Sequence, residues 1–174
     1  FGSIVASGPN TANPHAVPSD RVVQRGDFVL MDYGAGYCDY RSDMTRTVVV
    51  GEPTPEQLDL YALVRRTHEE CAAAVHAGVE GNDIFKLSRK IIGDAGYGDY
   101  YNHGLGHGVG IDIHEMPNFN RSMNIIEAGS VITIEPGVYL PGIGGVRLED
   151  YGVVTEDGYE PFTKSTHELQ VIDC

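Results

Sequence analysis

Hydrophobic and polar residues alternate with a period of two through much of the first fifty residues, a pattern typical of strands. In FVLMDY (28–33), Asp32 falls on the same face as a phenylalanine and a leucine. In the β-branched run that follows, Asp43 falls on one face with the two threonines of TRTVVV. Gly34 and Gly36 lie in the short interval between the two aspartates. This interval predicts two neighbouring strands joined by a tight connection.

A helical period replaces the alternation over residues 54–96. The string TPEQ at 54–57 has the order of an N-cap, a first-turn proline and a capping-box partner. Apolar residues then recur at helical spacing up to Gly78, which we expect to end the helix. A second helix is predicted from Asn82 to near Gly96. Both helices are interpreted as packing against a sheet.

Strand patterns and glycine-rich turns return from residue 103 to the end of the chain. VITIE alternates up to Glu135 before a Pro-Gly break, and VRLEDY alternates through Arg147 and Glu149. EDG at 156–158 is a hairpin signal. Strands on both sides of a helix pair predict one α+β domain over residues 1–174 with a curved antiparallel sheet.

The acidic balance of the chain restricts its partners. There are 25 Asp and Glu against 12 Lys and Arg, and the formal net charge of −13 argues against nucleic acid and anionic membranes. No apolar run approaches about 18 residues, and no secretory leader is visible. Cys38, Cys71 and Cys174 show no CxxC spacing, so we expect a reducing, cytoplasmic location without a disulfide framework or zinc knuckle.

Four acids and one imidazole are candidate metal ligands: Asp32, Asp43, His107, Glu135 and Glu149. Each acid also has a structural interpretation, as a cap, a solvated strand end or the partner of a nearby arginine. Buried together, however, the acids would repel one another without a cation. Oxygen ligands with a single imidazole suit two divalent ions better than one zinc ion. Such two-metal sites serve hydrolysis, because one ion holds a water and both polarise the scissile carbonyl.

The segment NHGLGHGVGIDIHE (102–115) carries His103, His107 and His114 among four glycines. Glycine lets the backbone approach a ligand closely. His107, between two glycines, is expected to be an uncrowded and exposed ligand. The histidines at 68, 76 and 167 are interpreted as structural hydrogen-bonding residues.

The strings DYGAGYCDYRSDMTRT, GHGVGIDIHE, ITIEPGVY and GVRLEDYGVV resemble the proline-specific branch of the pita-bread metallopeptidases, the Xaa-Pro aminopeptidases and Xaa-Pro dipeptidases (prolidases). The resemblance covers almost the whole chain. It implies a pita-bread fold with helices on the outer face of the sheet. It also implies a catalytic domain that is incomplete at its N-terminus, with the first helix pair and an N-terminal domain missing. We therefore expect association with the missing part or with another copy of the chain.

The resemblance implies two divalent ions, with Mn²⁺ favoured and Co²⁺ or Zn²⁺ as alternatives. Asp32 would chelate one ion, Asp43 and Glu149 would bridge both, and His107 and Glu135 would complete the other. The substrate-binding residues implied are His15, His103, His114 and Arg147, and the three histidines are implied as catalytic residues together with Glu135.

The implied reaction is hydrolysis of the Xaa-Pro bond at the N-terminus of a peptide whose second residue is proline, by a metal-bridging hydroxide. Glu135 is the candidate to move the water proton to the leaving nitrogen, and His114 or His103 to stabilise the oxyanion. Asn118 stands where dipeptidases of this group often carry a basic residue, which favours longer peptides. A prolidase, and a non-catalytic peptide- or protein-binding module on the same scaffold, remain the alternatives.

Overall fold

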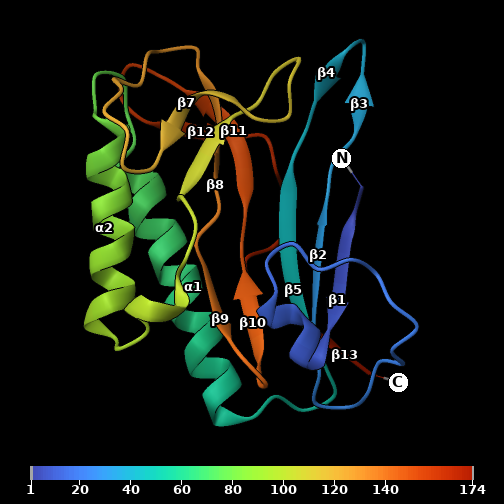
Figure 1. Ribbon diagram of the computed structural model, residues 1–174. Coiled ribbons are helices and arrows are strands. Elements are labelled where there is room, and N and C mark those ends of the chain that lie inside the picture. The colour runs from blue at the N-terminus through green and yellow to red at the C-terminus, as the bar shows by residue number, and fades with distance from the viewer. Residues whose placement is uncertain (1, 174) are drawn as a thin grey trace.

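The computed structural model describes residues 2–173, which form two main sheets with a helix pair on one side (Figure 1). The first sheet has the order β1-β2-β5-β13 and the second the order β12-β11-β8-β6-β7. The strands of the first are β1 (Ile4–Ser7), β2 (Phe28–Tyr33), β5 (Met44–Val50) and β13 (Val171–Ile172). Those of the second are β6 (Gly106–Gly108), β7 (Glu115–Phe119), β8 (Val131–Ile134), β11 (Asp150–Val154) and β12 (Tyr159–Pro161). The predicted α+β class is confirmed.

Two short ribbons and two short 3₁₀ helices complete the described chain. The ribbon of β9 (Gly137–Leu140) and β10 (Gly144–Arg147) lies between the main sheets, and β3 (Gly36–Tyr37) pairs with β4 (Tyr40–Arg41) beyond the end of β2. The 3₁₀ helices are η1 (Gly8–Ala12) and η2 (Gly98–Tyr100). Neighbouring strands are antiparallel except β13, which runs parallel to β5.

The N-terminal alternation places residues as predicted. Phe28, Leu30 and Asp32 are all buried, and β2 pairs with β5 so that Asp32 lies opposite Thr45. Thr45 also bridges to Glu149, which connects the first sheet to the chain between β10 and β11. This junction brings Asp32 and Glu149, which lie far apart in the sequence, to positions beside the same residue, Thr45.

One predicted strand is interrupted. Residues 146–151 were expected to alternate through Arg147 and Glu149, but β10 ends at Arg147 and β11 begins at Asp150. The backbone N–H groups of Leu148 and Glu149 donate to Pro136 and Thr45 respectively, so the chain changes partners at this point. As a result Arg147, Glu149 and Asp150 are all buried, which simple alternation does not allow.

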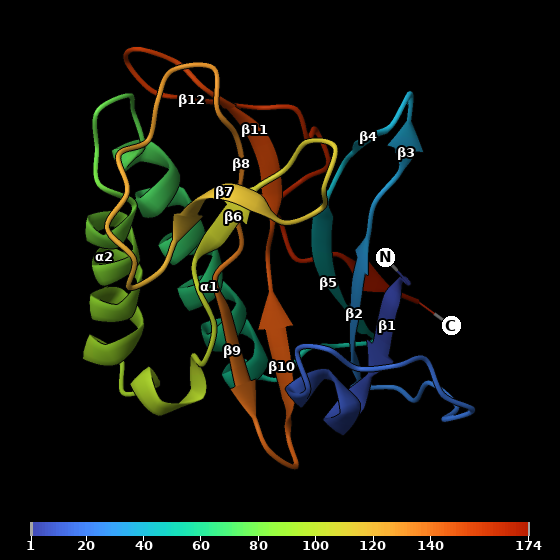
Figure 2. The same ribbon diagram turned by 45° about the horizontal axis from the view of Figure 1, so that its top comes forward.

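The helix pair consists of α1 (Pro55–Ala74) and α2 (Gly81–Asp94), side by side in both views (Figures 1 and 2). The capping box of Thr54 and Gln57 is present as predicted. α1 ends at Ala74, before the predicted Gly78, because the following backbone turns to bond with Thr155 and Ile126. β7, at the edge of its sheet, runs beside α2.

The core lies between the helices and the strands. One cluster joins Val64 of α1 and Ile92 of α2 to Val138 and Val146 of the β9–β10 ribbon. A second joins Cys71 to apolar residues of β8 such as Ile132. Within residues 2–173 no helix is both long and apolar enough to cross a membrane. Cys71 is buried and Cys38 exposed, and both are free thiols, whereas Cys174 lies outside the described residues.

Candidate metal centre

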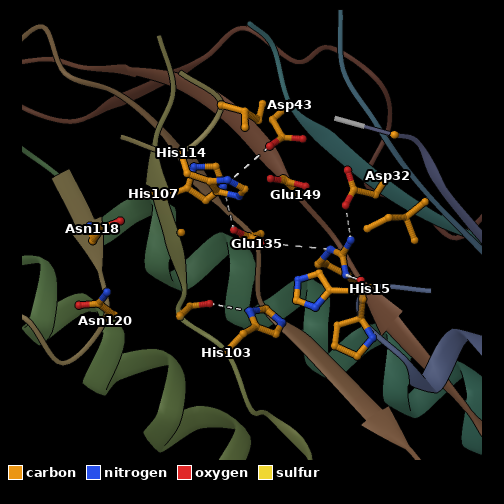
Figure 3. Close-up of a pocket in the computed structure, with 17 residues that line it drawn as sticks. His15, Asp32, Asp43, His103, His107, His114, Asn118, Asn120, Glu135 and Glu149 are labelled. Carbon is orange, nitrogen blue, oxygen red and sulfur yellow. Dashed lines mark hydrogen bonds and ion pairs between the residues drawn. The ribbon is translucent and has the colours of Figure 1, made fainter. Parts of the chain in front are cut away.

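A single pocket of about 420 Å³ brings together all nine residues that the sequence singled out (Figure 3). Its lining includes the five candidate ligands together with His15, His103, His114 and Arg147. They come from β2, β6, β10, the loops around these strands and the junction before β11. The predicted site residues therefore meet in space, although they span most of the chain.

Three of the candidate ligands form a tight buried group. Ligand atoms of Asp43, His107 and Glu149 all lie within 4.8 Å of one another. Glu135 joins them, with its Oε1 3.3 Å from His107 Nε2, and Asp43 Oδ2 lies 3.8 Å from the same nitrogen. A divalent ion at this position would find carboxylate oxygens and one imidazole nitrogen as ligands.

The tautomer of His107 suits a ligand. Its Nδ1 lies 3.0 Å from the carbonyl oxygen of Gly108, so Nδ1 carries the proton and donates it there. Nε2 then turns its lone pair towards the acids. The backbone N–H of His107 donates to Thr133 Oγ1, which fixes β6 against β8.

The prediction that His107 is exposed is wrong, since only 9% of it is accessible. The glycines beside it make room for protein rather than for a ligand. A Cβ on Gly106 would lie 2.1 Å from the Thr133 carbonyl oxygen, and one on Gly108 would lie 2.4 Å from that of Met116. The glycines therefore allow β6 to lie close between β7 and β8, with the imidazole directed into the pocket.

Ion pairs leave part of the acidic cluster unsatisfied. Oδ1 of Asp32 and Oδ1 of Asp43 are buried and have no hydrogen-bond partner among residues 2–173. An unpartnered buried carboxylate oxygen is costly. The arginines considered as partners of Asp43 and Glu149 pair with other acids: Arg46 with Asp150, and Arg147 with the second oxygen of Asp32. These two free oxygens fit metal ions.

Without a metal, the pocket disfavours negative charge. Burial raises the pKa of Asp43 to about 7, with a further contribution from the charge of Asp32. Burial likewise raises the pKa of Glu135 to about 8, although Arg147 acts in the opposite direction. The pKa of His107 falls to about 4, chiefly through burial, so the imidazole is neutral at pH 7. Two divalent cations would reverse this balance for the acids.

Arg147 is held by the protein on every side. Its Nε donates to Thr45 Oγ1, its Nη1 to Pro14 O and Tyr139 Oη, and its Nη2 to Asp32 Oδ2. With all three nitrogens engaged and 3% of the residue exposed, the side chain orients Asp32. Arg147 also lies close to Glu135, at 4.0 Å between Nε and Oε2.

The three further histidines of the pocket, His15, His103 and His114, differ in exposure and in hydrogen bonding. His15 and His114 are exposed, and the ring of His114 lies 4.3 Å from that of His107 between centroids. His103 is engaged at both nitrogens, at 2.7 Å from Gly104 O and 2.9 Å from Tyr139 Oη. Nδ1 must donate to the carbonyl oxygen, so Nε2 accepts from the tyrosine.

Two residues of this network were missed from the sequence. Tyr139 links Arg147 to His103, and Thr45 donates to Glu149 Oε2 at 2.6 Å while accepting from Arg147. The sequence gives a weak indication that Thr45 belongs to the site, because Thr45 shares a strand face with Asp43. It gives no such indication for Tyr139, because a tyrosine in a short apolar strand is most often a core residue.

The fold is that of the pita-bread enzymes, as solved structures demonstrate. An Xaa-Pro dipeptidase from Bacillus anthracis superposes with a TM-score of 0.96 at 44% identity, covering 99% of this chain and 49% of that one. An X-Pro aminopeptidase from Thermotoga maritima gives a TM-score of 0.96 at 38% identity, again covering 99% and 49%.

The model of metallopeptidase family M24 matches residues 1–156, and the chain belongs to this family. The Xaa-Pro dipeptidase of Pyrococcus furiosus is 45% identical over 170 residues, which are 97% of this chain and 49% of that protein. The chain thus spans about half the length of the curated relatives it matches.

Proposed function

We propose that this chain carries the catalytic centre of a metallo-exopeptidase that hydrolyses the Xaa-Pro bond at the N-terminus of peptides. One observation carries the proposal: four carboxylates and one neutral imidazole share a pocket in which two buried carboxylate oxygens have no hydrogen-bond partner among the described residues. Membership of family M24 and the names of the relatives support the same reaction.

The proposed ligands are Asp32, Asp43, His107, Glu135 and Glu149. Asp43 and Glu149, which lie in one group with His107, are assigned as the bridging acids. Two divalent ions bound there would supply a water that is activated near neutral pH and a Lewis acid for the scissile carbonyl. The imidazole among the carboxylates favours Mn²⁺ or Co²⁺ over Mg²⁺, with Zn²⁺ as a further possibility.

Glu135 is the proposed proton carrier. Its side chain is partly accessible, at 18%, and reaches His107 and the pocket from the end of β8. A carboxylate in this position can accept a proton from the attacking water and deliver it to the proline nitrogen. Delivery is required because the departing nitrogen leaves as an amine. Thr133 Oγ1, 3.4 Å away, helps to orient the carboxylate.

Among the histidines, the hydrogen bonds favour His114 for stabilising the oxyanion. An oxyanion needs a donor, and Nε2 of His103 already serves as an acceptor from Tyr139. His114 is exposed beside His107 and has a free edge. His103 is assigned to shaping the pocket wall, and the exposed His15, which lies across the pocket from His114 in Figure 3, to contacting the substrate.

Two observations favour different substrate lengths, a dipeptide and a longer peptide. The similar Xaa-Pro dipeptidases favour a dipeptide. The amides of Asn118 and Asn120 in the pocket wall favour a longer peptide, because neither supplies a positive charge for a free carboxylate. Comparing hydrolysis of an Xaa-Pro dipeptide and an Xaa-Pro tripeptide by the purified, manganese-loaded chain decides between them.

The decisive test of the proposal is metal content together with turnover. Asp43→Ala and Glu149→Ala should lose both bound metal and hydrolysis, whereas Asp59→Ala on the exposed face of α1 should keep both. Full metal binding by the two site variants would refute the bridging assignment. Metal binding without hydrolysis of either substrate would favour a binding module.

We further propose that the chain functions as the catalytic part of a larger assembly, with the remainder of a longer protein or with a second copy. The length of the relatives supports this, as do exposed apolar residues such as Val17, Tyr37 and Ile143. Light scattering on the purified chain, alone and mixed with the remaining half of a full-length protein, tests the association.

A further inference from the structure

A second cluster of potential ligands lies outside the pocket just described. It consists of His68 of α1, Asp150 at the start of β11, and His167 from the segment before β13. None of the three lines the metal centre, although Asp150 directly follows Glu149 in the chain. The cluster therefore needs an explanation of its own.

The geometry of this cluster is compact. One ligand atom from each residue lies within 4.8 Å of the others. Asp150 Oδ2 is 2.6 Å from His167 Nε2 and 3.6 Å from His68 Nε2. Neighbouring ligands around a tetrahedral zinc ion are roughly 3.3 Å apart, so small side-chain adjustments would form a three-ligand face.

His68 corrects the expectation that it is a structural hydrogen-bonding residue. Only 2% of it is exposed, and neither ring nitrogen has a hydrogen-bond partner within the described part of the chain. By contrast, His76 contacts the carbonyl oxygen of Ala77, and His167 contacts Asp150. A buried imidazole without a partner is costly, and a metal ion facing Nε2 would satisfy that nitrogen.

The surroundings orient the carboxylate of this cluster. Arg46 Nη2 donates to one oxygen of Asp150, Oδ1, at 2.6 Å, so the other oxygen, Oδ2, faces the two histidines.

We propose that His68, Asp150 and His167 form a second metal site, which binds a borderline divalent ion such as Zn²⁺ through two imidazoles and one carboxylate. The ion replaces the hydrogen bond between His167 and Asp150. The side chain of His167 is 27% exposed, which gives the ion access and leaves a fourth position for water. Because the ligands come from α1, β11 and the C-terminal segment, the ion fastens that segment to the body of the fold.

This inference does not rest on the proposed peptidase activity, so it is tested with the first centre disabled. The background variant is Asp43→Asn/His107→Gln. Into it are introduced His167→Gln, His68→Gln and, as a matched control, His76→Gln on the exposed turn after α1. Each protein is loaded with Zn²⁺ and gel-filtered. Zinc per chain is measured by elemental analysis and the zinc-induced rise in Tm by scanning calorimetry.

One equivalent of zinc is expected in the background and in the His76→Gln control. His167→Gln should lose that equivalent together with the rise in Tm, and His68→Gln should do the same. If His68→Gln fails to fold, the partly exposed His167 decides the result. A folded background protein without zinc, or unchanged zinc in His167→Gln, would overturn the proposal. In those cases the three residues bind no metal, and only His167 and Asp150 are hydrogen-bonded to each other.

Discussion

The guanidinium of Arg147 donates to Oδ2 of Asp32, which joins the end of β10 to a proposed metal ligand on β2. The same guanidinium reaches Tyr139 and Thr45, and through them His103 and Glu149. One buried cation thus orients side chains on both sides of the pocket.

Replacing Arg147 with lysine should therefore impair the centre without removing positive charge. A lysine cannot reproduce the planar fork that contacts Asp32, Tyr139 and Thr45. Loss of such an orienting contact typically lowers metal affinity or activity roughly 10- to 100-fold. Titration with Mn²⁺ and measurement of kcat check this. Unchanged values for both would mean that Arg147 does not orient Asp32.

His114→Ala should lower turnover while leaving metal content intact. Removing one oxyanion donor typically costs about 100-fold or more in kcat. His103→Gln should have a smaller effect, because its nitrogens are already bonded to the protein. Loss of metal from the His114 variant would instead identify this residue as a ligand. Elemental analysis beside steady-state kinetics separates the two outcomes.

Asp43 and Glu135 should stabilise the metal-free protein less and less as the pH rises from about 4 to about 8. Asp43 and Glu135 have pKa values of about 7 and 8 in the folded chain, against about 4 when unfolded. Their stabilising contribution is complete below about pH 4 and is lost as the pH rises through the folded values. Burial lowers the pKa values of His68, His103 and His107 to about 4, so above about pH 7 these three are neutral in both states and do not mask the effect.

Thermal unfolding of the metal-stripped protein between about pH 7 and pH 9 tests the last part of the expected decline, which should level off once the pH exceeds both folded pKa values. Asp43→Asn should flatten it, because the amide does not ionise. Manganese should remove it, because bound cations favour the charged acids. A constant Tm over this range without metal would contradict the strong burial of these acids.

Gly106→Ala should destabilise the fold by roughly 1–3 kcal/mol, since the added methyl group would press on the Thr133 carbonyl and force β6 away from β8. Gly93→Ala provides the control. That glycine lies in α2 with open space around it, so alanine should stabilise the helix by roughly 0.5–1 kcal/mol. Urea unfolding of both variants gives the comparison, and equal stabilities would argue against the tight packing of β6.

Much of the fold follows from local signals in the sequence. The period-two pattern correctly places Asp32 on the buried face of β2, and the capping box locates the start of α1. The end of α1 and the break between β10 and β11 could not be read, because both depend on tertiary hydrogen bonds to distant residues. A run such as VRLEDY looks continuous until its partner strands are known.

The candidate site could be assembled from residue types and a family resemblance, but its internal order could not. Nothing in the sequence indicates that Arg147 contacts Asp32 and Arg46 contacts Asp150 rather than their neighbours in the chain. The lack of hydrogen bonds at the ring nitrogens of His68, within the described residues, could not be predicted either, because a histidine in an amphipathic helix gives no sign of its partners. Such pairings are decided by how two sheets meet.

The bridge between Thr45 and Glu149 links segments that are over one hundred positions apart. In the denatured chain these segments move independently, so no preassembled binding site exists for a metal ion. Metal binding consequently stabilises only molecules in which the two sheets are already packed together. The metal supply during synthesis would then limit the fraction of stably folded chains. Chains made in cells starved of manganese should be degraded faster than chains made with manganese present.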